Sequence, residues 1–247
     1  MFALYIIYHK IVYNYLYETI SEDNKKYITF YGVKDKITST PLHAPCIYEY
    51  ELPIYNKELQ ENRYNESSAF YHVYKNKLHE KYSYVGFLQY DMTLPNETLT
   101  TIQNTIECYP NIPIIFASYF ATDESKNILG GSLQLYVKPI SNFGSILENY
   151  NRFFGKKYTI DEIIVHPLIM CNMFVIPSYM YEKYMQWLEC SYFSYTICEE
   201  ELYTICSIKL NRGHIIEICS ALFLAVELIE GASIYGVNIS HDHGLRV

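Results

Sequence analysis

The sequence lacks the short motifs that mark the commonest nucleotide-dependent and hydrolytic enzymes. It contains no Gly-x-Gly-x-x-Gly, no P-loop, no Gly-x-Ser-x-Gly and no His-Glu-x-x-His. Each of these motifs carries a mechanism: the glycine-rich loops bring backbone amides to phosphates, and the other two place a serine nucleophile or a zinc ion. Their absence removes the support for a dinucleotide oxidoreductase, an NTPase, an α/β-hydrolase or a zincin.

Positive charge is scarce in this chain. The sequence has 19 Lys and Arg against 27 Asp and Glu, a formal net charge of -8, and the basic residues are spread thinly. A protein that binds DNA or RNA needs a basic patch or stripe that neutralises phosphates. We therefore expect no nucleic-acid partner.

Paired cysteines and long uncharged apolar runs are also missing. The seven cysteines are an odd number and include no Cys-x-x-Cys pair, so neither a disulfide framework nor a zinc knuckle is indicated. The most apolar stretch, 215–231, is interrupted by Glu217 and Glu227 and predicts no membrane span. The first residues lack the basic leader of a signal peptide. These features predict a soluble, cytoplasmic protein with reduced thiols.

Apolar and aromatic residues are abundant. They make up 50% of the 247 residues and include 28 Tyr, which is enough for the core of one globular domain spanning 1–247. Short apolar runs predict buried strands at 3–9, 27–33, 84–90, 113–120 and 170–177. Predicted helices occupy the second half of 56–79 with Asn65 as N-cap, 96–108, 140–155 ending at Gly155, 178–193 with Ser178 as a cap, and 214–229.

Strands and helices alternate along the chain without internal repeats or low-complexity linkers. This alternation predicts an α/β fold with a mainly parallel sheet. Ligands of such sheets bind at the carboxyl ends of the strands. Asp91 occupies such an end because it follows the apolar run 84–90, and so does the loop after Tyr8.

Asp91 has two interpretations. In the first, its carboxylate forms an Asx turn that leads into Thr93 and Pro95. In the second, the carboxylate holds a divalent cation, which neutralises a diphosphate leaving group. The stretch by itself favours the turn, and the ligand role gains weight from the resemblance described below.

Three other groups are candidates for chemistry. His241 and His243 flank Asp242, and in an extended segment both imidazoles point to one side, where they can ligate a metal; a solvated tail is the alternative. Glu217 stands among apolar residues, where an unpaired carboxylate is costly, and is our first candidate for a base that deprotonates a hydroxyl. Glu66 lies near a predicted helix start, where a carboxylate is commonly structural.

Five segments occur in an order that resembles the GT-A-like glycosyltransferases of capsular polysaccharide and lipopolysaccharide synthesis. In those families an opening strand ends in His-Lys, a Glu-bearing helix ends in Lys-Asn, a strand ends in a Tyr-containing polar motif, and a Met-Phe-x-x-Pro strand precedes an amphipathic helix. The segments here are YIIYHK, NESSAFYHVYKN, YVGFLQYDM, CNMFVIPSYMYEKYMQWL and GHIIEICSALFLAVEL. One departure is that Gln89 to Met92 stand where the family often has a His-Tyr-Arg-Arg type sequence.

The resemblance implies a Rossmann-type, mainly parallel sheet flanked by helices, with a nucleotide-binding half at about 1–120 and an acceptor-side half at about 121–247. It implies a hexosyl- or pentosyltransferase that moves a sugar from a nucleotide-diphosphate sugar to a glycan or other hydroxyl acceptor. Asp91, with His241 or His243, would hold Mn²⁺ or Mg²⁺ and stabilise the departing diphosphate, and Glu217 would act as the base. The residues expected to contact the donor are Tyr8, His9, Lys10, Glu66, Asn76, Gln89, Tyr90 and Asp91.

Two alternatives stay open on the sequence. The first is a non-catalytic module that binds a sugar nucleotide or a glycan, which the missing basic pair and the single Asp favour. The second is a structural or partner-binding α/β protein whose tyrosines form an interface. Binding of a nucleotide sugar without turnover would favour the first, and no effect of any nucleotide on the melting temperature would favour the second.

Overall fold

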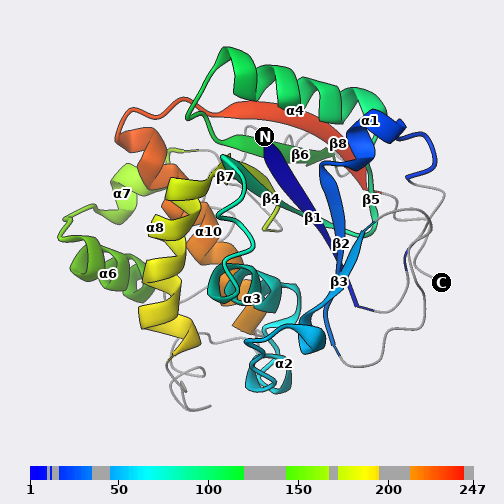
Figure 1. The fold of residues 1–247 in the computed structure, drawn as a ribbon. Coiled ribbons are helices and arrows are strands. Elements are labelled where there is room, and N and C mark those ends of the chain that lie inside the picture. The colour runs from blue at the N-terminus through cyan, green and yellow to red at the C-terminus, as the bar shows by residue number, and fades with distance from the viewer. Residues whose placement is uncertain are drawn as a thin grey trace.

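The computed structural model describes residues 1–9, 12, 17–34, 45–119, 143–166, 172–194 and 212–241. These residues build an eight-stranded sheet with the strand order β3-β2-β1-β4-β7-β6-β8-β5 (Figure 1). The strands are β1 (Phe2–Tyr8), β2 (Ile28–Gly32), β3 (Cys46–Tyr48), β4 (Tyr84–Gln89), β5 (Met92–Thr93), β6 (Ile114–Tyr119), β7 (Phe174–Pro177) and β8 (Tyr235–His241).

Most neighbouring strands in the sheet are parallel. β3, β2, β1 and β4 form one parallel block, and β6 and β8 form a parallel pair. β7 runs antiparallel to both β4 and β6 and so joins the two blocks, while the short β5 is antiparallel to β8. The carboxyl ends of β1, β2, β4, β6 and β8 therefore lie along one edge of the sheet, which we call the carboxyl edge.

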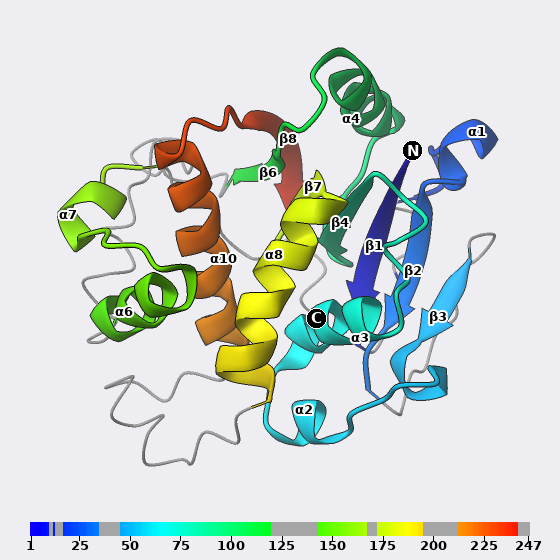
Figure 2. The ribbon, with the colours of Figure 1, turned by 60° about the vertical axis from the view of Figure 1, so that its left-hand side comes forward.

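Helices cover both faces of the sheet (Figures 1 and 2). One face carries α4 (Asn96–Cys108) with the short α1 (Glu22–Lys25) beside it, and the other carries α3, α6, α8 and α10. The remaining elements are α2 (Glu58–Glu61), α3 (Ser68–Lys75), α6 (Phe143–Phe154), α7 (Ile160–Ile163), α8 (Ser178–Leu188), α10 (Arg212–Ile229), the 3-10 turns η2 (Glu49–Glu51) and η3 (Asn65–Ser67), and a π-helical turn η6 (Glu189–Phe193).

Side chains of β1 alternate between two hydrophobic cores. Tyr5 and Ile7 belong to the core beneath α3, α8 and α10, whereas Leu4 and Ile6 belong to the core beneath α4. Successive strand residues point to opposite faces, so a strand that is covered on both faces is apolar throughout. All seven residues of β1 are buried, which explains why the sequence marks this strand so clearly.

The α/β fold expected from the sequence is confirmed. β1, β2, β4, β6 and β7 correspond to the five predicted strands, and α3, α4, α6, α8 and α10 to the predicted helices. α6 ends before Gly155, which has the left-handed conformation (φ +65°) that a helix-terminating glycine adopts. The predicted inner face of α8 is buried as expected, and consists of Tyr181, Tyr184, Met185 and Leu188.

Two capping predictions are wrong. Asn65 does not cap α3; it is the first residue of η3 and has a φ of +51°, while Ser67 occupies the N-cap position. Asn tolerates this left-handed conformation better than most residues, so it starts the tight turn that precedes the helix. Ser178 is the first helical residue of α8, and its hydroxyl donates a hydrogen bond of 2.6 Å to the carbonyl of Tyr82.

Two observations bear on the cysteines and on membranes. Cys46, Cys108, Cys190 and Cys219 are free thiols. Within the ranges given above, no helix combines the length and the apolar character needed to cross a membrane.

Candidate active site

The carboxyl edge brings together residues from three separate segments. His9 follows β1, Tyr90 follows β4, and Glu66 lies in η3, just before α3. Nδ1 of His9 is 3.5 Å from Oε1 of Glu66, and the His9 ring meets the Tyr90 ring edge-on, with the centroids 5.2 Å apart. The parallel register explains part of this meeting, because Ile7 of β1 pairs with Gln89 of β4, and the residues that follow them become neighbours.

Asp91 lies beside this cluster, in the turn that joins β4 to β5. The residue is half-buried, and its carboxylate is close enough to Tyr17 to influence the Tyr17 hydroxyl. Burial raises the pKa of Tyr17, and the Asp91 charge raises it further. Tyr17 donates a hydrogen bond of 2.9 Å to the carbonyl of Tyr90, which ties the turn to the segment before α1.

The backbone of His241 lies close to that of Asp91. In the antiparallel pair of β5 and β8, Met92 is the partner of His241. Paired residues in such a ladder have Cα atoms about 4.5–5.5 Å apart. Asp91 immediately precedes Met92, so the end of β8 lies beside the turn that contains Asp91. Lys10 and His243 lie outside the described residues.

Two other residues expected at the site, Tyr8 and Asn76, have different surroundings, whereas Gln89 is at the carboxyl edge. Tyr8 is buried on the α4 side of the sheet, with its hydroxyl 3.1 Å from Sγ of Cys46. Burial raises the pKa of Tyr8, and its hydrogen bonds raise it further. Asn76 is at the far end of α3, where its amide bonds the backbone of Ile54 and the carbonyl of His72. Gln89 is half-buried at the end of β4.

Glu217 is on the first part of α10, which contacts η3. The backbone N–H of Gly213 donates a hydrogen bond of 3.2 Å to the carbonyl of Arg63, two residues before η3. In the first two turns of α10, Gly213, His214 and Glu217 are the positions that are not buried. Residues three and four apart share a helix face, so these three positions form one accessible strip at the start of the helix.

Arg212 is a candidate that the sequence analysis missed. It is the first residue of α10 and is 7% exposed, which makes it the one buried Lys or Arg among the described residues. Its guanidinium lies 5.7 Å from the ring centroid of Tyr64. Burial raises the pKa of Tyr64, and the Arg212 charge opposes part of that rise. A buried guanidinium beside η3 is suited to binding an anion.

A buried polar network holds the start of α3 beneath the carboxyl edge. Glu49 is fully buried and accepts hydrogen bonds from the Ser68 hydroxyl (2.7 Å) and from the backbone N–H of Lys34 (2.9 Å). Nδ1 of His72 lies 3.2 Å from the same carboxylate. Lys34 follows β2 and Ser68 begins α3, so the network fixes the start of the helix, and the adjoining η3, against the sheet.

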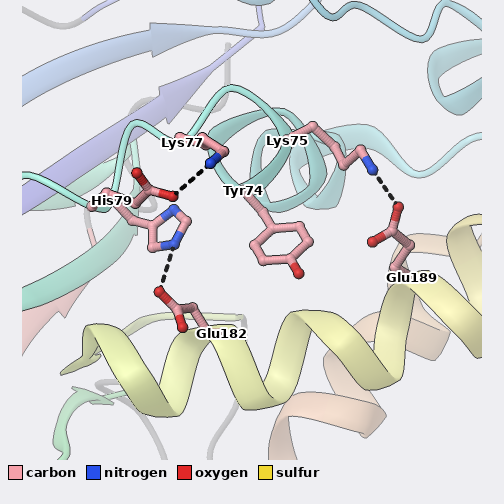
Figure 3. Close-up of a pocket in the computed structure, with 7 residues that line it drawn as sticks. Tyr74, Lys75, Lys77, His79, Glu182 and Glu189 are labelled. Atoms are coloured by element: carbon pink, nitrogen blue, oxygen red, sulfur yellow. Dashed lines mark hydrogen bonds and ion pairs between the residues drawn. The ribbon is translucent and has the colours of Figure 1, made fainter.

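A cavity of about 310 Å³ lies between α3 and α8, and none of the predicted site residues lines it (Figure 3). Two side-chain contacts cross it: Lys75 Nζ forms an ion pair of 2.6 Å with Glu189 Oε1, and His79 Nε2 lies 3.4 Å from Glu182 Oε1. The hydrogen bond with Glu189 raises the pKa of Lys75. Because these polar side chains contact one another across the cavity, we interpret it as a gap between packed helices and not as the candidate active site. Its lining residues are Tyr74, Lys75, Lys77, His79, Glu80, Glu182 and Glu189.

The described side chains do not by themselves build a metal site. Among them, no three His, Cys, Asp or Glu side chains come together in a way that could hold a metal ion. Asp91 alone is one carboxylate, whereas Mg²⁺ and Mn²⁺ take several oxygen or nitrogen ligands. A metal held by Asp91 with His241 or His243 therefore stays a prediction, and no chemical step proposed below depends on it.

The strand order, the antiparallel β7 and the helices on both faces define a GT-A-like α/β fold. Among solved structures, the chain is similar to the apo structure of WbbM, a bifunctional glycosyltransferase. The TM-score is 0.55 at 15% sequence identity, and the match covers 97% of this chain but only 45% of the WbbM chain. At this identity the likeness establishes the fold. No protein-family model and no curated protein sequence matches the chain.

Proposed function

We propose that this chain is a glycosyltransferase domain that moves a sugar from a nucleotide-diphosphate sugar to a hydroxyl acceptor. The observation that carries the proposal is the clustering of His9, Glu66, Tyr90 and Asp91 at the carboxyl edge of a GT-A-like sheet. Open α/β sheets bind their ligands at that edge. The structural similarity to WbbM supports the same class of reaction, although this chain spans 45% of that protein.

The reaction breaks the bond between the anomeric carbon of the sugar and a phosphate oxygen of the donor. The nucleoside diphosphate leaves with the electron pair, and the acceptor oxygen forms the new bond to the anomeric carbon. In an inverting reaction, the acceptor proton passes to a base within hydrogen-bond reach. Glu217 is our candidate for this base, because it lies on the accessible strip at the start of α10.

The departing diphosphate carries negative charge, and the site must complement that charge as it develops. Arg212, buried beside η3, is the candidate cation among the described residues. Lys10 is a second candidate from the sequence. Mn²⁺ or Mg²⁺ at Asp91 is the proposed cofactor, and it would neutralise phosphate oxygens when bound. The Asp91 carboxylate would repel the diphosphate without such a cation. We therefore expect the affinity for the donor to depend on the metal ion.

A panel of UDP-, GDP- and dTDP-sugars, with and without Mn²⁺, tests the proposal. Each compound is first screened for a rise in melting temperature, and those that bind are then tested for release of the nucleoside diphosphate in the presence of glycan acceptors. We expect one nucleotide class to raise the melting temperature and to be turned over. Binding without turnover would favour the non-catalytic module, and no response to any nucleotide sugar would contradict both.

A further inference from the structure

Asn172 stands where three elements of the candidate site meet. It comes just before β7, at the carboxyl edge, and has a φ of +54°. This left-handed conformation is uncommon for residues other than glycine, and Asn is one of the few that adopt it. The backbone therefore holds the Asn172 side chain in a direction that an ordinary extended residue would not give it.

Both ends of the Asn172 amide are used. Its Oδ1 accepts a hydrogen bond of 2.6 Å from the hydroxyl of Ser220, and its Nδ2 donates one of 3.3 Å to Oγ of Ser67. Ser220 and Ser67 are 1% and 2% exposed, so water cannot replace these bonds freely. The Ser220 hydroxyl also lies 2.6 Å from the hydroxyl of Tyr184 on α8, which is fully buried.

The two serines belong to the two segments that carry candidate carboxylates. Ser67 follows Glu66 in η3, and Ser220 lies on α10, three residues after Glu217. A single amide side chain therefore links η3 to α10, in addition to the hydrogen bond between Gly213 and Arg63. If either bond is lost, the turn that carries Glu66 and the helix that carries Glu217 lose the side-chain link between them, while the contacts of Arg212 and Gly213 remain.

We propose that Asn172 is a positioning residue, which sets the distance between η3 and α10 and thereby orders Glu66 and Glu217 around the donor. This role rests on the proposed function. Reacting groups must be held within a few tenths of an ångström of the productive geometry, and a misplacement of about 1 Å costs about 100-fold in rate. Asn172 acts through Ser67 and Ser220 and takes no direct part in the chemistry.

The variants Asn172→Gly and Ser67→Ala test this role. Glycine adopts a positive φ without strain, so Asn172→Gly removes the amide while sparing the backbone. We expect kcat to fall about 10- to 100-fold, with KM for the donor within about twofold of the wild-type value, because positioning acts on the transition state more than on binding. An unchanged kcat in a folded Asn172→Gly variant would overturn the proposal.

Asn151 offers a matched control on α6. Its amide also makes two hydrogen bonds, to the carbonyl (2.8 Å) and the backbone N–H (3.0 Å) of Tyr158. Asn151→Ala should also lower the melting temperature, because it removes a similar pair of bonds, yet leave kcat unchanged. If the two variants lowered kcat equally, the effect would be one of general stability, and the proposal would fail.

The ¹H–¹³C resonance of the His9 ring gives a readout that needs no substrate. This ring lies against Glu66 and edge-on to Tyr90, so its chemical shift depends on where η3 sits. Asn172→Gly and Ser67→Ala should both move the resonance, and Asn151→Ala should not. If no nucleotide sugar were turned over, the proposed function would fail while this shift would still decide whether Asn172 positions η3. A His9 resonance unmoved in both variants would overturn the inference.

Discussion

Nδ1 of His9 lies 3.5 Å from Oε1 of Glu66, and the two side chains are 22% and 32% exposed. They come from different segments, yet they meet where the parallel strands β1 and β4 end, and enough of each remains exposed for a ligand to reach it. This pair therefore defines the centre of the candidate site better than any contiguous motif does.

The first prediction concerns Glu66 itself. Glu66→Ala should lower the turnover of the donor about 10- to 100-fold, because it removes a group ordered at the reacting centre. Glu61→Ala, at an exposed position of α2, is the control and should leave turnover unchanged. Because His9 and Glu66 are in contact, the effects of His9→Ala and Glu66→Ala should not add in the double variant. Wild-type turnover in a folded Glu66→Ala protein would contradict the assignment.

The second prediction concerns the buried carboxylate of Glu49. The N–H of Asn56 donates to Nε2 of His72, so the neutral ring carries its proton on Nδ1, directed at Glu49. Removing one partner of a buried hydrogen-bond network leaves the others unsatisfied, and His72→Ala should cost about 1–3 kcal/mol of unfolding free energy. Urea denaturation measures this cost, with Glu51→Ala at an exposed position as the control. A loss below about 1 kcal/mol would mean that the network relaxes at little cost.

The third prediction concerns the close approach of β7 to β4. A Cβ at Gly86 would lie 2.6 Å from Cγ2 of Val175 and 2.9 Å from the carbonyl oxygen of Phe174. Gly86→Ala should therefore destabilise the protein by about 1–3 kcal/mol through overpacking. In α6, a Cβ at Gly144 meets nothing closer than 3.8 Å, so Gly144→Ala should stabilise by about 0.5–1 kcal/mol. Equal changes in melting temperature for the two substitutions would show that the packing between β4 and β7 at Gly86 is looser than these distances indicate.

The fourth prediction concerns alkaline pH. Burial holds the pKa values of many tyrosines above their ordinary value of 10.0, among them Tyr31, Tyr181, Tyr184 and Tyr192. Above pH 10 the folded protein therefore binds more protons than the unfolded chain, so the unfolding free energy decreases as pH rises. Below pH 10 this contribution is fully present.

Tyrosinate absorbance and circular dichroism, followed together against pH, check this expectation. The exposed tyrosines should ionise first, and the buried ones should ionise only as the secondary structure is lost. In concentrated guanidinium all of them should titrate together. A single titration of all tyrosines near pH 10 with the fold intact would be the contrary result.

Much of the fold could be predicted because its central strands are buried on both faces. β1 and β4 are short, nearly unbroken apolar runs that include aromatic and β-branched residues, which is typical of strands covered on both faces. β8 was missed because it contains Gly236 and Asn238, which are poor strand formers, and only Val237 and Ile239 of its apolar side chains are buried. The position of β8 is fixed by its pairing with β6, and this long-range contact cannot be inferred from the local sequence pattern.

The site could be predicted only in part. The carboxyl ends of β1 and β4 were identified correctly as places for polar residues, but the contact of His9 with Glu66 depends on η3 and on the left-handed Asn65. Arg212 was missed because its burial comes from packing against Tyr64, far away in the sequence. Asn76 was expected at the site from the resemblance, and its amide bonds the chain at Ile54.

The most direct test of the account is the affinity of wild-type protein and Asp91→Asn for the nucleotide sugar that the panel identifies. Isothermal titration in the presence of Mn²⁺ should show binding to the wild type that weakens at least about tenfold, or about 1.4 kcal/mol, in Asp91→Asn. Asp23→Asn, at an exposed position of α1, should bind as the wild type does. Equal affinity of Asp91→Asn and wild type, with the same response to Mn²⁺, would contradict a donor site at this edge of the sheet.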